Sequence, residues 1–224
     1  MPRRNRVDPW GDLVADPGRG LFTGNRGCLV DADGRVVRHH AGRAWITCRL
    51  RFKDWRVGLA RPGRWTPLFF LDDAVALAAG HRPCSTCRRE DHVAYREAVA
   101  AGDVEDGVED SVEDGADTGM RLRATEIDRR LADERLRPGR GLDRATDRRL
   151  RPGRLDELPA GTVVLGEGRR PSLWTGSALQ PFDFSGWGSP RPPAHPRVEV
   201  LTPPTSVSAL AHGFVPHLHA TADT

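Results

Sequence analysis

Two cysteines separated by two residues are the most informative feature of the chain. Cys84 and Cys87 lie in the run AAGHRPCSTC, where they follow a glycine and a proline. A CxxC turn lets both sulfurs face one point about 2.3 Å from each, which is the geometry that tetrahedral Zn²⁺ requires. Two further cysteines precede the turn in strand-like segments. The residues therefore predict one zinc site, with the ligands Cys28, Cys48, Cys84 and Cys87.

Other interpretations of these cysteines stay open. Cys28 and Cys48 could be small buried hydrophobic residues, because cysteine is among the most buried residue types. A redox dithiol is a second alternative, although the CxxC follows a helix-like segment instead of opening a helix directly after a strand. Disulfides are less expected, since the start MPRRNRVDPWGD has no apolar segment of an export signal, and we expect a cytoplasmic protein.

The elements that must position the cysteines can be predicted from turn and helix signals. Short apolar runs between residues 13 and 70 predict a small antiparallel sheet, with a hairpin turn at DADG, residues 31–34. The run DDAVALAAG predicts a short helix with Asp72 or Asp73 as its N-cap and Gly80 in the left-handed conformation after its end. A second helix is predicted behind the CxxC, ending at Gly102.

The segment that contains these elements resembles a known zinc domain. The stretch LFFLDDAVALAAGHRPCSTCRRED, residues 68–91, is similar to the second half of the metal-binding domain of the Ada DNA-repair methyltransferase. The resemblance, which covers about residues 66–91, implies a four-cysteine zinc site on a small α/β fold that contacts DNA. It further implies that one zinc-bound thiolate accepts a methyl group from a backbone phosphotriester.

The resemblance assigns the ligands by position. Cys84 and Cys87 match the second ligand pair, and Cys48 matches one member of the first pair. The family has a second cysteine four residues later, where this chain has Phe52. The missing ligand would have to be Cys28 or one of the histidines His39, His40 and His81.

The rest of the chain divides by composition. Residues 1–102 form the predicted zinc-binding module, and residues 103–119, with three VED units, are predicted to be an acidic disordered linker. Residues 120–157 are predicted to be a helix, with Met120, Ala124, Ile127 and Leu131 on one face, followed by an Arg-rich loop. Residues 158–224 form a β-rich section. We thus expect an α+β protein with small antiparallel sheets and short helices, whose two sections could pack as one globule.

Part of the β-rich section can be aligned with part of the first section, through either shared local structure or chance agreement of a few residues. With an offset of 133 residues, Gly213 aligns with Gly80 and Pro216 with Pro83. Both copies read as a strand, a capped short helix, a glycine and then a proline. His217 aligns with Cys84, so the CxxC is an addition to a shared local scaffold.

The charge distribution suggests a polyanionic partner. The net charge is only +3, but residues 1–64 hold 14 basic and 6 acidic side chains. The leading prediction is a Zn²⁺ protein that contacts DNA or RNA, with phosphate contacts from arginines that include Arg26, Arg43, Arg49 and Arg51. A zinc-thiolate alkyl acceptor, a zinc hydrolase and a scaffold protein with purely structural zinc are the alternatives. Enzymatic activity and oligomeric state are left open.

Several function classes lack support in the residues. No apolar run approaches the eighteen or so residues of a membrane span, and no phosphate-binding loop or Ser/His/Asp arrangement is recognisable. The tryptophans of the predicted β sections are expected to pack in the core and sheets instead of stacking on bases. They are Trp45, Trp55, Trp65, Trp174 and Trp187.

Overall fold

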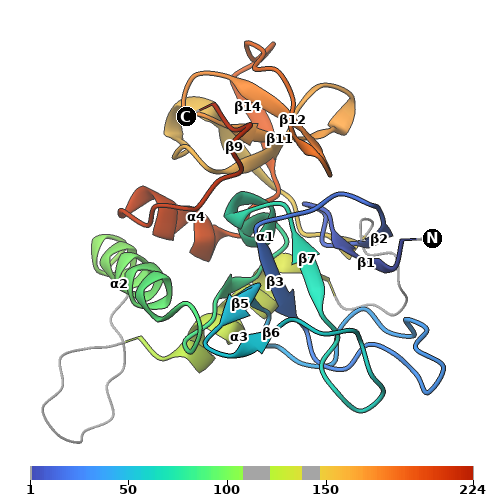
Figure 1. Cartoon of the computed structure of the whole chain (residues 1–224). Coiled ribbons are helices and arrows are strands. Elements are labelled where there is room, and N and C mark those ends of the chain that lie inside the picture. The colour runs from blue at the N-terminus through green and yellow to red at the C-terminus, as the bar shows by residue number, and fades with distance from the viewer. Residues whose placement is uncertain (1, 108–121, 138–146, 224) are drawn as a thin grey trace, which may run out of the picture.

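The computed structural model describes residues 2–107, 122–137 and 147–223. Helices and strands are mixed along these ranges, which confirms the predicted α+β class (Figure 1). Within them the strands form two six-stranded sheets, one from each half of the chain, and a separate hairpin. Helix α1 (Asp73–Ala78) lies between the two sheets and shares a core with both.

The first sheet positions the cysteines and has the strand order β2-β1-β7-β3-β4-β8. Its strands are β1 (Arg4–Val7), β2 (Leu13–Ala15), β3 (Phe22–Asn25), β4 (Ile46–Arg49), β7 (Leu68–Phe70) and β8 (Arg82–Pro83). Most pairs are antiparallel, as predicted, but β1 pairs with β7 and β4 pairs with β8 in parallel. Residues 50–81 connect β4 to β8, which is long enough for the crossover that parallel neighbours need.

Two of the predicted turns are present. The DADG segment closes a turn in which the Asp31 N–H donates to the Arg35 carbonyl at 3.0 Å and Gly34 has a φ of 76°. Helix α1 begins after Asp72, whose carboxylate accepts the Val75 N–H at 3.0 Å. Gly80, with a φ of 83°, then turns the chain into β8.

Helix α2 (Arg89–Glu105) is longer than predicted. The prediction ended it at Gly102 and assigned residues 103–107 to a disordered linker, and this is wrong for the described residues. Asp103 forms an ion pair with Arg130 at 2.6 Å, and Glu105 accepts a hydrogen bond from His212 at 2.8 Å. These tertiary contacts extend the helix past its glycine. Residues 108–119 of the predicted linker lie outside the described residues.

Helix α3 (Ala124–Arg135) confirms the helix predicted between residues 120 and 137. Ile127 and Leu131 are completely buried against Tyr95 of α2 and Leu210 of helix α4 (Pro204–Ala211). Met120, also predicted on this face, lies outside the described residues. The three helices therefore form a layer that joins the halves of the chain.

The second sheet has the order β13-β12-β11-β10-β14-β9. Its strands are β9 (Arg151–Arg154), β10 (Val163–Leu165), β11 (Pro171–Trp174), β12 (Leu179–Asp183), β13 (Gly186–Trp187) and β14 (Arg197–Val200). The β-rich section is confirmed, but the Arg-rich loop predicted up to residue 157 contains β9 and the short 3-10 segment η2 (Leu155–Glu157). Strand β9 is an edge strand paired with β14, so its exposed Arg and Pro residues need no apolar alternation. A second 3-10 segment, η3, covers Glu167–Arg169.

One core spans both sections of the chain. Leu68, Phe70 and α1 pack with Val163, Leu173 and Leu201 of the second section, and all of these side chains are buried. None of the helices in the described part of the chain has the length and apolar character needed to cross a lipid bilayer.

Candidate metal centre

The structure brings three of the four cysteines together. The Sγ atoms of Cys48, Cys84 and Cys87 all lie within 4.8 Å of one another, and all three residues are buried. They come from two elements that are distant in sequence, since Cys48 lies on β4 and the other two follow β8. Three sulfurs at this separation can share one metal ion.

Strand pairing places Cys48 beside the CxxC. Thr47 is the partner of Pro83 in the parallel β4–β8 pair, and the Cys84 N–H donates to the Thr47 carbonyl at 2.9 Å. The residues that follow these two partners on each strand are Cys48 and Cys84. Their meeting is thus a consequence of register, which the spacing of residues along the chain does not reveal.

The turn itself favours thiolates. The Thr86 N–H points at the Cys84 Sγ at 3.4 Å, and the Arg88 N–H donates to the Cys84 carbonyl at 3.1 Å. Cys87 lies two residues before the first residue of α2, a helix of 17 residues whose N-terminus carries partial positive charge. Backbone donors and a helix N-terminus both stabilise negative sulfur.

The three thiols are electrostatically coupled. A hydrogen bond from Cys48 lowers the pKa of Cys84, and the same hydrogen bond raises the pKa of Cys48. Burial raises the pKa of Cys87. The protein alone therefore favours a single thiolate shared by its neighbours, and binding of a metal ion to all three sulfurs must release protons.

Cys28 is not part of the cluster, which corrects the predicted four-cysteine site. Thr23 of β3 is the partner of Cys48, and the sheet pairing ends at Asn25, so Cys28 lies beyond the opposite end of the strand pair. Its sulfur contacts the Val30 carbonyl at 3.6 Å instead.

The alternative histidine ligands are engaged in a separate buried cluster. Nε2 of His81 accepts a hydrogen bond from the Arg26 Nε at 3.2 Å, and Nε2 of His39 lies 2.8 Å from the Arg26 Nη1. The rings of His39, His40 and His81 all pack around Trp45. The side chain of Phe52 packs against the three cysteines, and none of these three histidines belongs to their cluster. Position 52 is where the resemblance to the Ada domain expects the fourth cysteine.

The arginines predicted to contact nucleic acid differ in exposure. Arg43, Arg49 and Arg51 are exposed. Arg26 is completely buried, with its guanidinium carbon 3.9 Å from the centre of the Trp45 ring, which corrects its prediction as a phosphate contact. Burial of Arg26 was not predictable from composition, since arginine is one of the most exposed residue types.

Trp55, one of the five tryptophans predicted to pack in the core and sheets, lies on a strand outside the core and is 40 % exposed. It lies on the hairpin formed by β5 (Arg51–Phe52) and β6 (Trp55–Arg56), and its ring centre is 5.7 Å from that of Trp65. Basic residues alternate with aromatic ones in the run RLRFKDWR, and this alternation was the signal in the sequence.

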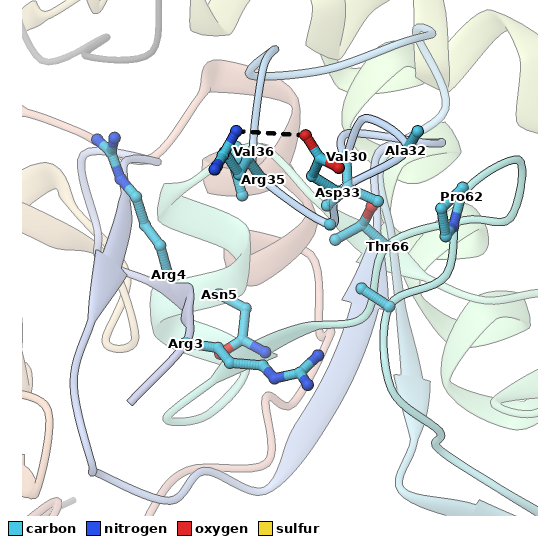
Figure 2. Close-up of a pocket in the computed structure, with 12 residues that line it drawn as sticks. Arg3, Arg4, Asn5, Val30, Ala32, Asp33, Arg35, Val36, Pro62 and Thr66 are labelled. Atoms are coloured by element: carbon cyan, nitrogen blue, oxygen red, sulfur yellow. Dashed lines mark hydrogen bonds and ion pairs between the residues drawn. The ribbon is translucent and has the colours of Figure 1, made fainter. Parts of the chain in front are cut away.

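A pocket of about 500 Å³ lies on another part of the same half of the molecule. Figure 2 shows it between the start of β1, the turn that carries Asp33, and the loop that carries Pro62 and Thr66. Arg3, Arg4 and Arg35 line it, and Arg35 forms an ion pair with Asp33 at 3.3 Å. The pocket contains no cysteine, but it extends the basic character of this half.

No protein-family model matches the chain, and neither a curated protein nor a solved structure matches it. The fold and the cysteine cluster alone therefore define the class. The chain is an α+β protein with three buried cysteines placed at metal-binding distance.

Proposed function

We propose that the protein binds one Zn²⁺ through Cys48, Cys84 and Cys87, and that the surface around this centre contacts the backbone of a nucleic acid. The observation that carries the proposal is the convergence of three buried sulfurs within 4.8 Å. Sulfurs around tetrahedral zinc are about 3.8 Å apart, the edge of a tetrahedron with bonds of about 2.3 Å. Thiolate ligands favour zinc over the harder cations Mg²⁺ and Ca²⁺.

The charges around the cluster support a polyanionic partner. Three thiolates on Zn²⁺ would leave a net charge of −1 on the metal site. The exposed arginines Arg49, Arg51 and Arg89 lie close to the cysteines in the sequence and add positive charge around it. Phe52 packs against the cysteines, which ties the β5–β6 hairpin to the centre, while its neighbours Arg51 and Lys53 face solvent. Basic side chains arranged in this way can neutralise the phosphates of a nucleic acid.

The metal part of the proposal is tested by elemental analysis of the purified protein. We expect one zinc per chain in the natural protein and its loss in Cys48→Ser, Cys84→Ser and Cys87→Ser. Cys28→Ser is the matched control and should keep its zinc. Absence of metal from the natural protein would overturn the proposal, and loss of zinc in the control would return Cys28 to the ligand set.

The nucleic-acid part is tested by titrating a labelled duplex and a labelled single strand at several salt concentrations. Affinity should fall steeply with salt, and Arg51→Ala should lower the slope of log K against log salt by about 1 if one phosphate contact is lost. Arg191→Ala serves as the control, because Arg191 is exposed and lies beside Leu179 of the second sheet. A salt-independent affinity, or no affinity, would overturn this part.

A second candidate, the alkyl acceptor, is favoured by the incomplete ligand set. Phe52 and Ile46 pack against the cysteines, and neither side chain can bind a metal. A zinc ion bound by the three cysteines alone keeps one open position, as reactive zinc sites do. A thiolate would attack the methyl carbon of a methylated backbone phosphate. The S–C bond would form as the C–O bond breaks, and the phosphate oxygen would leave with the bonding electrons. Mild alkylation followed by mass spectrometry separates the candidates, because an acceptor is modified at one cluster cysteine and a closed structural site at none.

A further inference from the structure

The β5–β6 hairpin presents an aromatic pair that the metal centre does not use. Phe52 and Trp55 are opposite each other across the hairpin, and the two-residue turn of Lys53 and Asp54 joins them. Phe52 packs against the cysteines, whereas Trp55 packs against Trp65 with an interplanar angle of 36°. One aromatic side chain thus holds the hairpin on the metal centre, and its partner is 40 % exposed to solvent.

Three other tryptophans of the described ranges are fixed by burial and a hydrogen bond, and a fourth, Trp10, packs partly buried against the main core. Trp45, Trp174 and Trp187 are buried, and their indole N–H groups donate to Gly42, Leu158 and Asp72 respectively. Across the residues that the structure describes, the indole N–H groups of Trp55 and Trp65 have no protein acceptor. An exposed ring with a free donor is available to a ligand.

The surroundings of this pair are strongly basic. Residues 49–66 contain six basic side chains and Asp54 as their single acid. Five of these basic side chains flank Trp55 and Trp65 and are exposed. Within the described ranges none of the five has a carboxylate partner within 4 Å. They are Arg51, Lys53, Arg56, Arg61 and Arg64. Such a surface complements a ligand that combines phosphates with flat, polarisable rings.

We propose that Trp55 and Trp65 form a stacking platform for unpaired bases, so that the nucleic acid contacted by this protein is single-stranded. The inference rests on the proposed function and specifies its substrate class. Every base has a π-face, so stacking on an aromatic side chain is tolerant of sequence, but the bases of a duplex are already stacked on one another and unavailable. The basic side chains around the tryptophan pair supply the phosphate contacts.

The experiment compares five labelled ligands of equal length on the zinc-loaded full chain. The ligands are a thymidine strand, a uridine strand, a deoxyuridine strand, a duplex, and an abasic DNA strand that keeps the phosphates without the bases. We expect the thymidine strand to bind about tenfold more tightly than the abasic strand, with quenching of tryptophan fluorescence. The deoxyuridine strand, which differs from the uridine strand in the pentose alone, then identifies DNA or RNA as the source of the unpaired bases.

The variants locate the stacking. Trp55→Ala should weaken binding of the thymidine strand about tenfold and leave binding of the abasic strand unchanged, while Trp55→Phe keeps a ring and recovers part of the affinity. Leu59→Ala is the matched control, because Leu59 is 68 % exposed in the same loop region and has no π-face. Zinc content and circular dichroism must equal those of the natural protein.

The outcomes distinguish this inference from the proposed function. Equal affinity for single strand, duplex and abasic strand, unchanged by Trp55→Ala, would overturn the stacking platform and leave backbone contact intact. Failure of all five ligands to bind would overturn both.

Discussion

Helices α1 and α4 share one local order of strand, helix and glycine stop, and the chain leaves these two units, called copies below, in different ways. Each helix follows a strand, and they end at Ala78 and Ala211, which are 133 residues apart. The glycines that stop them, Gly80 and Gly213, have φ values of 83° and 96°. After Gly80 the chain pairs with β4 and forms the cysteine turn. After Gly213 it continues without a strand to the end of the described residues.

The residues after the second copy hydrogen-bond to the first copy. The backbone N–H of His217, which aligns with Cys84, donates to the Asp73 carboxylate at 3.0 Å, and the N–H of His219 donates to Asp72 at 3.0 Å. The tail behind α4 therefore lies on the N-terminus of α1. The helix and its glycine stop are therefore a scaffold without chemistry of their own. Pairing of the following residues with β4 brings Cys84 and Cys87 to Cys48 and so creates the cysteine cluster.

The largest difference between the copies lies at equivalent positions inside the two helices. Asp73 of α1 holds Arg88 through two hydrogen bonds of 2.6 and 2.8 Å, and both side chains are buried. Ser206, its equivalent in α4, shares one hydrogen bond of 2.8 Å with the Tyr95 hydroxyl. Asp73→Ala should lower the free energy of unfolding by about 3–5 kcal/mol, because it removes two hydrogen bonds from the buried Arg88 guanidinium, although the ion pair with Asp91 at 2.7 Å remains.

The matched variant Ser206→Ala should lower the free energy of unfolding by only about 1–3 kcal/mol, the cost of one unsatisfied buried hydroxyl. Urea denaturation of both variants and of the natural protein measures both values. Equal effects would show that the buried ion pair does not distinguish the copies.

The two glycine stops offer a second test. Alanine in the left-handed conformation costs about 1–2 kcal/mol, and Gly213→Ala should cost this much alone, since a Cβ there meets nothing within 4 Å. At Gly80 a Cβ would lie 2.6 Å from the Arg135 Cδ. Arg135 is buried over the Trp45 ring at 3.7 Å and donates to the Gly80 carbonyl at 3.0 Å, so it cannot move aside freely.

Gly80→Ala should therefore cost about 1–3 kcal/mol more than Gly213→Ala because of overpacking. Thermal unfolding of the two variants, each compared with the natural protein, gives the difference. A smaller cost at Gly80 than at Gly213 would mean that Arg135 has another place to go, and the claim of a tightly packed first copy would be wrong.

The sequence predicted which residue types form the site better than it predicted how the strands bring them together. The CxxC, the N-cap of α1 and the glycine that stops α1 follow local rules, and the structure contains all three. Cys28 was assigned wrongly because register decides which cysteine faces the turn, and Thr23 is the residue opposite Cys48. Strand β9 was missed because an edge strand of RPGR has no alternating pattern. The exposure of Trp55 depends on a short hairpin outside the main sheets.

The smallest expected effect concerns the end of α4 and depends on pH. His212, equivalent to Ala79 in the first copy, contacts the Ser208 carbonyl through Nδ1 and the Glu105 carboxylate through Nε2, both at 2.8 Å. With two acceptors, the ring must carry both protons, and the hydrogen bond to Glu105 raises the pKa of His212 above 6.5. The stabilisation is complete below about pH 6.5 and is lost as pH rises through the higher folded pKa.

Glu105→Gln should remove this dependence and cost no more than about 0.2–1 kcal/mol at low pH, since Glu105 is largely exposed and solvent screens the pair. Glu97→Gln, an exposed change elsewhere on α2, is the control. Unfolding free energies between pH 5 and pH 9 give the measurement. If Glu105→Gln retains the full decline with pH, another group titrates in this range, and the contact between α2 and α4 gains nothing from the His212 charge. If the decline disappears in Glu105→Gln alone, the end of α4 is stabilised by charge where the end of α1 is stabilised by packing.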